Sequence, residues 1–349
     1  MPDGFTNRVS VIIPAYRRDD LLERCLASLR DVCSGVFPET IVVDDARQPS
    51  TRTLVETKFA FPTVHYVATP ENRGFAGAVN YAYPDCTREF VALVNSDILF
   101  EKEPFSALLD FLDEHPLAAV VQGKIVLRNG APGQDGRIDS CGYFLSSGGI
   151  LQNPSWMGNP SDAAFMAPAK VFFAYGAFLI FRNGLHNRTG GWLFNEAFQM
   201  YYEEADFCHR VWLAGYEVWY APTPSVFHAH GATAASHLSS EEVRRKVQRN
   251  ARISFLTCFG LRGILMVLLP FDILSLVQSL ARLLKGDASQ WRVCWFAWRE
   301  VFRARRDIVQ KRKIVQAFRR ISDGNLFKTI KRPIPVGKLM RAIRGMPLY

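Results

Sequence analysis

The sequence predicts an α/β fold in which a sheet is flanked by helices and followed by a helical extension. In the first 125 residues, short apolar runs of strand length alternate with segments whose apolar residues recur at helical spacing. Such alternation is typical of parallel strands joined by right-handed crossovers. Polar residues cluster where the apolar runs end, which is where α/β sheets bind ligands. The charge also changes along the chain: from Arg282 onwards there are 18 Lys and Arg against 4 Asp and Glu, whereas the preceding residues hold 24 against 29.

The expected elements follow in order. Strands are predicted at residues 9–16, 40–45, 63–68 and 91–94, and helices at 19–29, at 75–83 and from Pro104. The fourth strand leads directly into Asn95, Ser96 and Asp97. A turn with a helix cap explains these three residues as readily as a ligand site does, because Asn, Ser and Asp favour both.

The second half of the chain contains three further segments of interest. Residues 128–168 are rich in glycine and proline and are expected to form loops and short antiparallel strands, and residues 171–181 form an apolar strand interrupted by a glycine. A helix over residues 200–215 carries Glu203, Glu204 and Asp206 in its first turn, where the helix dipole alone would favour carboxylates. His228 and His230 share one face of a strand, as structural residues or as metal ligands.

Composition and motifs exclude several classes. Hydrophobic residues at 48% and charged residues at 21% describe a folded protein. The seven cysteines are scattered without a Cys-x-x-Cys pair, which indicates reduced thiols in the cytosol, and no apolar secretion signal begins the chain. A Gly-x-Gly-x-x-Gly fingerprint and a Walker motif are both missing, which disfavours dinucleotide dehydrogenases and P-loop NTPases. Gly74 and Gly77 fit either helix packing or close approach to a phosphate.

Taken as a series, the motifs resemble the inverting nucleotide-sugar glycosyltransferases of family two, and within it the bacterial rhamnosyltransferase-like branch. The series consists of the strand ending in Pro14-Ala15-Tyr16, then Asp44-Asp45, Asn72-x-Gly74-Phe75, Asn95-Ser96-Asp97, and the Glu203-Glu204-x-Asp206 helix with a histidine downstream. The resemblance implies a GT-A type, Rossmann-like mixed sheet in residues 1–235, with a donor half of about 1–125 and an acceptor half of about 126–235. Residues 236–349 form the extension.

The resemblance also implies roles for individual residues. Glu204 matches the general base, and Asp97 and His228 match the ligands of Mg²⁺ or Mn²⁺. Binding of the nucleoside-diphosphate sugar is assigned to Pro14, Ala15, Tyr16, Asp44, Asp45, Asn72, Gly74, Phe75, Gly77, Asn80, Asn95 and Ser96. The acceptor side is assigned to Tyr175, Gly176, Trp192 and Glu203. Three positions depart from the usual pattern: Asn95 replaces a carboxylate found in many members, Glu204 replaces the usual Asp, and Arg47-Gln48 replaces the familiar Gly-Ser pair after Asp45.

The implied activity is non-processive transfer of rhamnose or a similar hexose, from a dTDP- or UDP-sugar, to a glycan or lipid-linked glycan in cell-envelope polysaccharide synthesis. No Gln-x-x-Arg-Trp motif of processive enzymes is present. Alternative interpretations are a nucleotidyltransferase that forms the sugar nucleotide, and a non-catalytic protein that binds membrane surfaces or nucleic acid. The sequence contains no nucleic-acid-reading motif, so nucleic acid is disfavoured.

The extension predicts contact with a membrane. Residues 263–284 are strongly apolar, but Pro270 and Asp272 interrupt them, which favours a pair of helices lying in the membrane interface over a spanning segment. The Arg- and Lys-rich helices of residues 291–320, with Trp291, Trp295 and Trp298, are expected to lie on anionic headgroups at the inner face of the cytoplasmic membrane. Packing on the catalytic domain, or a homodimer formed through these helices, explains the same pattern.

Overall fold

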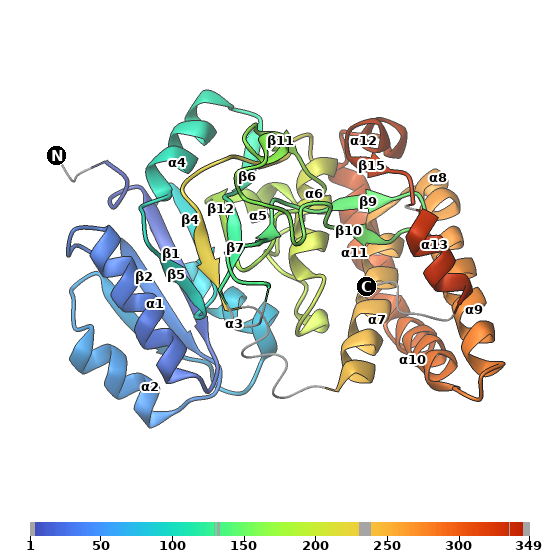
Figure 1. Ribbon diagram of the computed structural model, residues 1–349, viewed down its shortest axis with the longest axis horizontal. Coiled ribbons are helices and arrows are strands. Elements are labelled where there is room, and N and C mark those ends of the chain that lie inside the picture. Colours follow the sequence, from blue (N-terminus) through green and yellow to red (C-terminus); the bar gives the residue numbers. More distant parts are fainter. Residues whose placement is uncertain (1–3, 129, 131–132, 230–238, 335, 345–349) are drawn as a thin grey trace.

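The computed structural model describes residues 4–128, 130, 133–229, 239–334 and 336–344. A mixed eight-stranded sheet forms the centre of the N-terminal part, with helices on both faces (Figure 1). In spatial order its strands are β11 (Ala169–Lys170), β13 (Glu217–Tyr220), β6 (Ala118–Gln122), β12 (Phe178–Arg182), β4 (Phe90–Val94), β1 (Val9–Ala15), β2 (Glu39–Asp44) and β3 (Val64–Ala68). The strands from β4 to β3 are parallel, as the sequence predicts, and β12 runs antiparallel to both β4 and β6.

Burial on both faces explains why the central strands are continuously apolar. Along β1, Val9, Val11 and Ile13 belong to one hydrophobic cluster, while Ile12 belongs to the other. Helices α1 (Asp19–Val32) and α4 (Phe105–Glu114) bury their apolar side chains in the first cluster. Helices α3 (Gly74–Ala82) and α6 (Glu203–Leu213) bury theirs in the second. The shorter helical segments are α2 (Pro49–Thr53), η1 (Leu54–Lys58), η2 (Tyr83–Asp85), η3 (Ala163–Phe165), α5 (Leu185–Arg188) and η4 (Glu196–Phe198).

Two small sheets join distant parts of the chain. The four-stranded sheet has the order β5 (Ile98–Phe100), β14 (Val226–His228), β7 (Ile125–Leu127) and β8 (Ile138–Ser140). The three-stranded sheet contains β10 (Leu151–Gln152), β9 (Phe144–Ser146) and β15 (Lys331–Arg332), so the extension adds a strand to the N-terminal part. The first of these sheets matters for the site, because β5 begins directly after Asp97 and β14 ends at His228.

The interrupted strand expected at residues 171–181 is wrong in its first half. Strand β12 begins only at Phe178, after Gly176. Before that glycine, the chain bonds to other neighbours: the Val171 amide donates to Val218, and Phe173 forms a bridge with Tyr143. Gly176 therefore separates two segments that form hydrogen bonds with different neighbouring strands, and it does not interrupt a single strand.

The extension consists mainly of helices that add their buried apolar side chains to the second hydrophobic cluster (Figure 1). They are α7 (Ser240–Cys258), α8 (Leu261–Gly263), η5 (Ile264–Leu268), α9 (Leu269–Leu283), α10 (Ser289–Arg303), α11 (Arg305–Phe318), α12 (Asp323–Ile330) and α13 (Val336–Ile343). The expected break at Pro270 does not occur, because α8, η5 and α9 follow one another without a gap. Pro270 lies in the first turn of α9, immediately after a π-helical turn, where its missing amide hydrogen is tolerated. His230 and the expected domain boundary at 235 lie outside the described residues.

Candidate functional site

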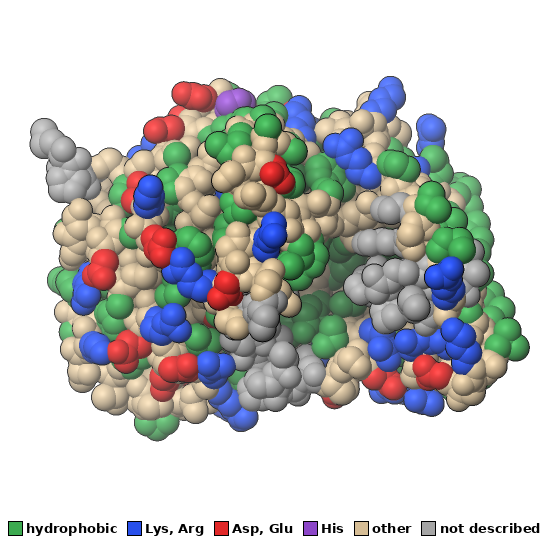
Figure 2. Space-filling view, viewed as in Figure 1, with side chains coloured by type: hydrophobic (Ala, Val, Ile, Leu, Met, Phe, Trp, Pro, Cys, Tyr) green, Lys and Arg blue, Asp and Glu red, His purple; other side chains and the backbone are tan. Residues whose placement is uncertain are grey.

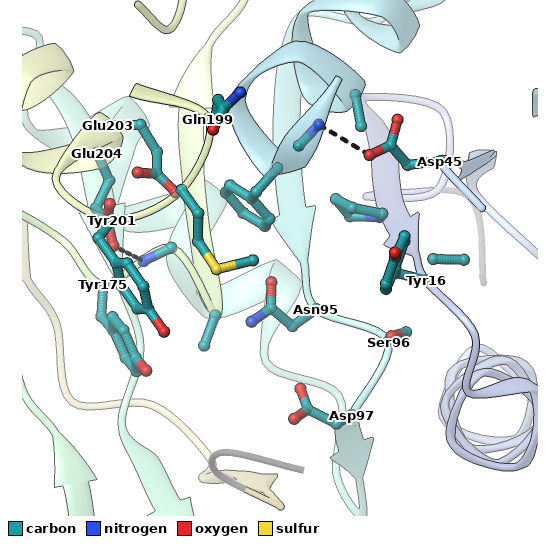
Figure 3. A pocket seen from close by; sticks show the side chains of 18 of the residues that line it. Tyr16, Asp45, Asn95, Ser96, Asp97, Tyr175, Gln199, Tyr201, Glu203 and Glu204 are labelled. Carbon is teal, nitrogen blue, oxygen red and sulfur yellow. Dashed lines mark hydrogen bonds between the residues drawn. The ribbon is translucent and has the colours of Figure 1, made fainter. Parts of the chain in front are cut away.

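One cavity of about 360 Å³ opens at the carboxyl ends of β1, β2 and β4. Most of the residues that the sequence singles out line it. In Figure 3, Tyr16 and Asp45 lie on one side, Glu203, Glu204, Tyr201 and Tyr175 on the opposite side, and Asn95, Ser96 and Asp97 between them. The predicted residues that line the cavity are Pro14, Ala15, Tyr16, Asp45, Asn72, Gly74, Phe75, Asn95, Ser96, Asp97, Tyr175, Gly176, Glu203, Glu204 and His228.

The Asp45 side of the cavity is held by three hydrogen bonds that the Asp45 carboxylate accepts. One carboxylate oxygen of Asp45 accepts from the Thr69 hydroxyl and the Arg73 amide, each at 2.8 Å, and the other accepts from the Gly74 amide at 2.9 Å. Gly74 has a φ of +69°, and a Cβ there would lie 2.7 Å from the carbonyl oxygen of Gln199. Only glycine therefore allows α3 to begin this close to the opposite wall.

Asp97 and His228 form a buried pair that is held by a third residue. The Asp97 carboxylate lies 3.2 Å from Nε2 of His228, and the Asp139 carboxylate lies 2.5 Å from Nδ1. All three residues come from the four-stranded sheet or the residue preceding it. Burial lowers the pKa of His228, but the hydrogen bonds to Asp139 and Asp97 outweigh this effect and raise it to about 9. Asp139 thus fixes the ring so that Nε2 points toward Asp97.

Glu203, which is buried, and Glu204, which is half-buried, lie side by side at the start of α6. Burial raises the pKa of Glu204, and burial followed by repulsion from Glu204 raises the pKa of Glu203 well above its ordinary value. The Gly176 amide donates to Oε1 of Glu204 at 3.4 Å, whereas Oε2 of each carboxylate has no hydrogen-bond partner in the described part of the chain (Figure 3). Asp206, the third acid of this turn, instead pairs with the buried Arg210 at 2.9 Å. The site therefore contains two carboxyl groups that bind protons more tightly than carboxyl groups in water.

The loop before α6 is strained and is clamped by the extension. Gln199, Tyr201 and Tyr202 all have positive φ values, of 60°, 70° and 79°. The side-chain amide of Asn250 in α7 donates to three carbonyls of this loop, including that of Tyr201 at 2.7 Å. Strained backbone of this kind persists when the surrounding structure holds it, and here α7 provides that support.

Four predicted residues do not line the cavity, because each is already engaged elsewhere. Asp44 is fully buried and accepts from the amides of the turn at residues 46–48. Gly77 packs against Arg73, where a Cβ would lie 2.5 Å from that residue's Cβ. Asn80 exchanges hydrogen bonds with the backbone of Phe194. Trp192 stacks against Arg210, whose guanidinium carbon lies 4.9 Å from the centre of the indole ring.

Several residues of the site were missed from the sequence. Ala78, Ala177, Gln199, Met200, Tyr201 and Lys246 also line the cavity, and Asp139 contacts it through His228. Lys246 comes from the extension, and its Nζ donates to the Gln199 side chain at 2.8 Å. A carboxylate in a short apolar strand, Ile138-Asp139-Ser140, is the one local signal that could have identified Asp139. The sequence near Lys246 resembles that of any solvated helix.

Comparisons with known proteins agree with this geometry. The model of the family described as glycosyl transferase family 2 matches residues 10–190. A low-salt glycan biosynthesis hexosyltransferase of Haloferax volcanii is 26% identical over 58% of this chain and 61% of its own length. An N-acetylglucosaminyl-diphospho-decaprenol L-rhamnosyltransferase of Mycobacterium tuberculosis is 26% identical over 67% of this chain and 81% of its own length. The alignment with the first of these relatives thus spans less than two thirds of it.

Solved structures show the same fold. The mannosyltransferase PcManGT from Pyrobaculum calidifontis, solved with GDP-Man and Mn²⁺, aligns with a TM-score of 0.51 and 17% identity over 91% of this chain and 87% of its own. The structure of GalNAc-T7 with UDP, GalNAc and Mn²⁺ aligns with a TM-score of 0.51 and 12% identity over 72% of this chain and 48% of its own. The predicted mixed sheet flanked by helices, with its helical extension, is therefore confirmed.

Proposed function

The chain belongs to glycosyl transferase family 2 and is a glycosyltransferase, and we propose that it transfers rhamnose or a similar hexose, with inversion and without processivity, to a glycan or lipid-linked glycan. One observation carries this proposal: the Asp97–His228 pair and Glu204 line the same cavity. The names of the relatives support the class of product, since one is a hexosyltransferase of glycan biosynthesis and the other a rhamnosyltransferase. The product would belong to cell-envelope polysaccharide.

We propose that the donor, a dTDP- or UDP-sugar, lies along the Asp45 side of the cavity. Pro14, Ala15 and Tyr16 would contact the base, and Asn72, Gly74 and Phe75 the remainder of the donor. Asp45 already accepts three hydrogen bonds from its own chain, so its first role is to hold this wall in place. A rigid wall lowers the entropic cost of binding the nucleotide.

The residues at the floor of the cavity fit a divalent cation, Mg²⁺ or Mn²⁺. Asp97 offers a carboxylate oxygen, and His228 offers Nε2 after that nitrogen has released its proton to make way for the cation, a donor pair that such ions accept. The Oδ1 atom of Asn95 is buried and has no hydrogen-bond partner within the described residues, so it adds an unsatisfied acceptor at the same place. No group of three or more His, Cys, Asp or Glu side chains suited to a metal occurs in the described ranges, which leaves the remaining coordination to the diphosphate and water. The cation would neutralise the charge of the leaving diphosphate.

We propose that Glu204 is the general base. Its carboxylate would take the proton from an acceptor hydroxyl, whose oxygen bonds to the anomeric carbon while the bond from that carbon to the diphosphate breaks. The diphosphate leaves with the electron pair of that bond, and attack from the opposite face inverts the anomeric centre. Burial favours this role, because a carboxylate with a raised pKa accepts a proton more readily.

The other walls of the cavity would receive the acceptor. Tyr175, Gly176 and Glu203 lie near Glu204, and Lys246 adds a cation from the extension. We therefore propose that residues 1–235 form the catalytic unit, divided near residue 125, and that residues 236–349 complete its acceptor side. The enzyme would work in the cytoplasm, at the inner face of the membrane.

Release of nucleoside diphosphate tests this proposal. Purified protein with Mn²⁺ and an acceptor would be incubated with dTDP-, UDP- and GDP-sugars in turn. Release from one donor, dependent on both metal and acceptor, is the expected result. If no donor reacts, while nucleoside triphosphate and a sugar phosphate yield a sugar nucleotide, the chain is a nucleotidyltransferase and the proposal fails.

A further inference from the structure

The outward side of the α8–α10 region is apolar and uncovered in the described structure. On α8, η5 and α9, large apolar residues that are each at least 47% exposed recur every three or four positions, and Leu284 directly follows the last of them. They are Leu261, Leu265, Leu269, Ile273, Leu276, Leu280, Leu283 and Leu284. On α10, Trp291, Trp295, Trp298 and Phe302 repeat the same spacing and are each at least 41% exposed. We call these twelve residues the apolar face. Part of this region lies at the right-hand edge of Figure 2, where green side chains gather over α9.

The spacing shows that each helix has two different sides. The opposite side of α9 is buried through Phe271, Leu274 and Gln278, and that of α10 through Val293 and Ala297. A surface helix of a water-soluble protein normally places polar residues on its outer side. Here the exposed side of each helix is apolar, and the two helices contact each other, so the exposed residues form a continuous region rather than scattered single residues.

The charge that interrupts the apolar segment faces the protein. Asp272 of α9 lies 2.6 Å from the guanidinium of Arg252, which is buried in α7. The Arg252 guanidinium also lies 5.5 Å from the ring of Trp298 in α10. The segment Leu261–Leu283 is long and apolar enough to cross a bilayer, with a mean hydropathy of 2.0, but one side of it is fixed to α7 through this ion pair. Lipid can therefore reach the apolar face without surrounding the helix.

The surrounding charge is strongly positive. Residues 261–320 contain 13 Lys and Arg and 4 Asp and Glu. Each of the four acids pairs with a cation: Asp272 with Arg252, Asp287 with Arg282, Glu300 with Arg303, and Asp307 with Lys311. Among the described residues, exposed cations of this segment without an ion pair include Arg262 and Arg306. An apolar surface with a cationic surround is complementary to anionic headgroups over acyl chains.

We propose that the apolar face docks in the plane of an anionic lipid surface, with α9 and α10 lying along it. This inference rests on the proposed function only for the location of the enzyme at a membrane. The sequence predicts that the Arg- and Lys-rich helices of residues 291–320 contact the headgroups, but part of the basic α11 faces inward. Arg312 donates to the carbonyls of Leu256 and Phe259, and Lys311 donates to Asn195. These cations hold the fold together and are not available to headgroups.

The docked arrangement brings the cavity close to the lipid. Helix α7 packs against α10, and its Lys246 lines the cavity. Arg245 of α7 lies over the ring of Phe296, and Glu241 lies 3.5 Å from Arg292. Packed helices lie about 8–10 Å apart, so roughly one helix separates the lipid surface from the acceptor wall. An acceptor anchored in the membrane could enter from that side.

Flotation with vesicles tests the proposal. The full-length protein would be mixed with phosphatidylcholine vesicles, with or without one part in four of phosphatidylglycerol. Wild type should float with the anionic vesicles and much less with the neutral ones. The double variant L265Q/W295Q should lose about tenfold or more of this binding, because binding scales with buried apolar area. The variant R262Q/R306Q, which removes the two exposed cations named above, should lose about fivefold per cation on anionic vesicles, and its remaining binding should weaken with salt.

The control variant V36Q/L117Q changes two exposed apolar residues far from these helices and should bind as wild type does. Transfer to a water-soluble acceptor should be unchanged in every variant, so failure of vesicle binding remains distinct from failure of the proposed function. Equal flotation of wild type and L265Q/W295Q would overturn the proposal. So would a wild-type dimer in sedimentation that ignores vesicles and that L265Q/W295Q dissociates, since the apolar face would then bind a second copy.

Discussion

The two walls of the cavity are built on opposite principles. On the Asp45 side, the carboxylate receives three hydrogen bonds and a short backbone turn is fully satisfied. On the Glu204 side, two carboxylates lie side by side, and three residues of the preceding loop have positive φ values. A satisfied wall is suited to binding, whereas an unsatisfied wall stores free energy that proton transfer can use. The difference indicates that one wall binds the nucleotide and the other wall activates the acceptor.

Asp139 lies on neither wall but supports the floor between them. Replacing Asp139 by Asn keeps the shape of the side chain and removes its charge, so Nε2 of His228 would be less firmly oriented toward Asp97. We expect the affinity for Mn²⁺, measured by calorimetry with nucleoside diphosphate present, to fall about 10–100-fold. Glu39→Gln is the matched control, because Glu39 is also a buried carboxylate with several hydrogen bonds but lies away from the cavity. Unchanged affinity in a folded Asp139→Asn protein would rule out this positioning role.

The strained wall depends on Asn250. Asn250→Ala removes the amide that donates to three loop carbonyls, so Glu204 should shift from its place. We expect kcat to fall about tenfold or more, since small misplacements of catalytic groups are costly. Donor binding should change little.

Asn183→Ala provides the comparison, because its side chain donates to the carbonyls of Cys86 and Arg88, outside the cavity. It should lower thermal stability by a similar amount and leave kcat near wild type. If both variants lost kcat equally, the effect of Asn250 would be one of general stability.

The raised pKa of Glu203 should make the thermal stability of the protein depend on pH. Because the folded-state pKa of Glu203 is raised, the folded protein binds this proton more tightly than the unfolded chain does. Stability from this group is therefore complete below the ordinary carboxyl pKa and is lost as pH rises toward the raised value. Glu203→Gln should melt about 2 °C or more above wild type at pH 8, and the gap should disappear at low pH. A gap that widened on acidification would contradict this, and Glu71→Gln, at an exposed position, should show none.

The sequence predicts the elements of the cavity better than the direction of individual side chains. The apolar runs placed Asp45 and Asp97 at strand ends, and the family resemblance added Glu204 and His228; all four line the cavity. Asp44 and Asp45 are neighbours with opposite environments, and the choice between them depends on a turn that only the folded backbone defines. Gly77 and Asn80 belong to the same helix as the cavity-lining Gly74 and Ala78, but they contact Arg73 and the backbone of Phe194 instead. Lys246 and Asn250 act over more than 45 residues of sequence, and no local pattern reports such contacts.

The assignment of catalysis to the Glu204 wall and of donor binding to the Asp45 wall is tested most directly by Glu204→Gln. Turnover and donor binding would be measured on the same preparation. Gln keeps the size of the side chain and cannot accept the acceptor proton. We expect kcat to fall about 10²–10⁴-fold and the affinity for the nucleoside-diphosphate sugar in the presence of Mn²⁺ to stay unchanged. Glu203→Gln, one residue away, should retain most of the turnover. Transfer by Glu204→Gln at near the wild-type rate would contradict the assignment of this residue as the base.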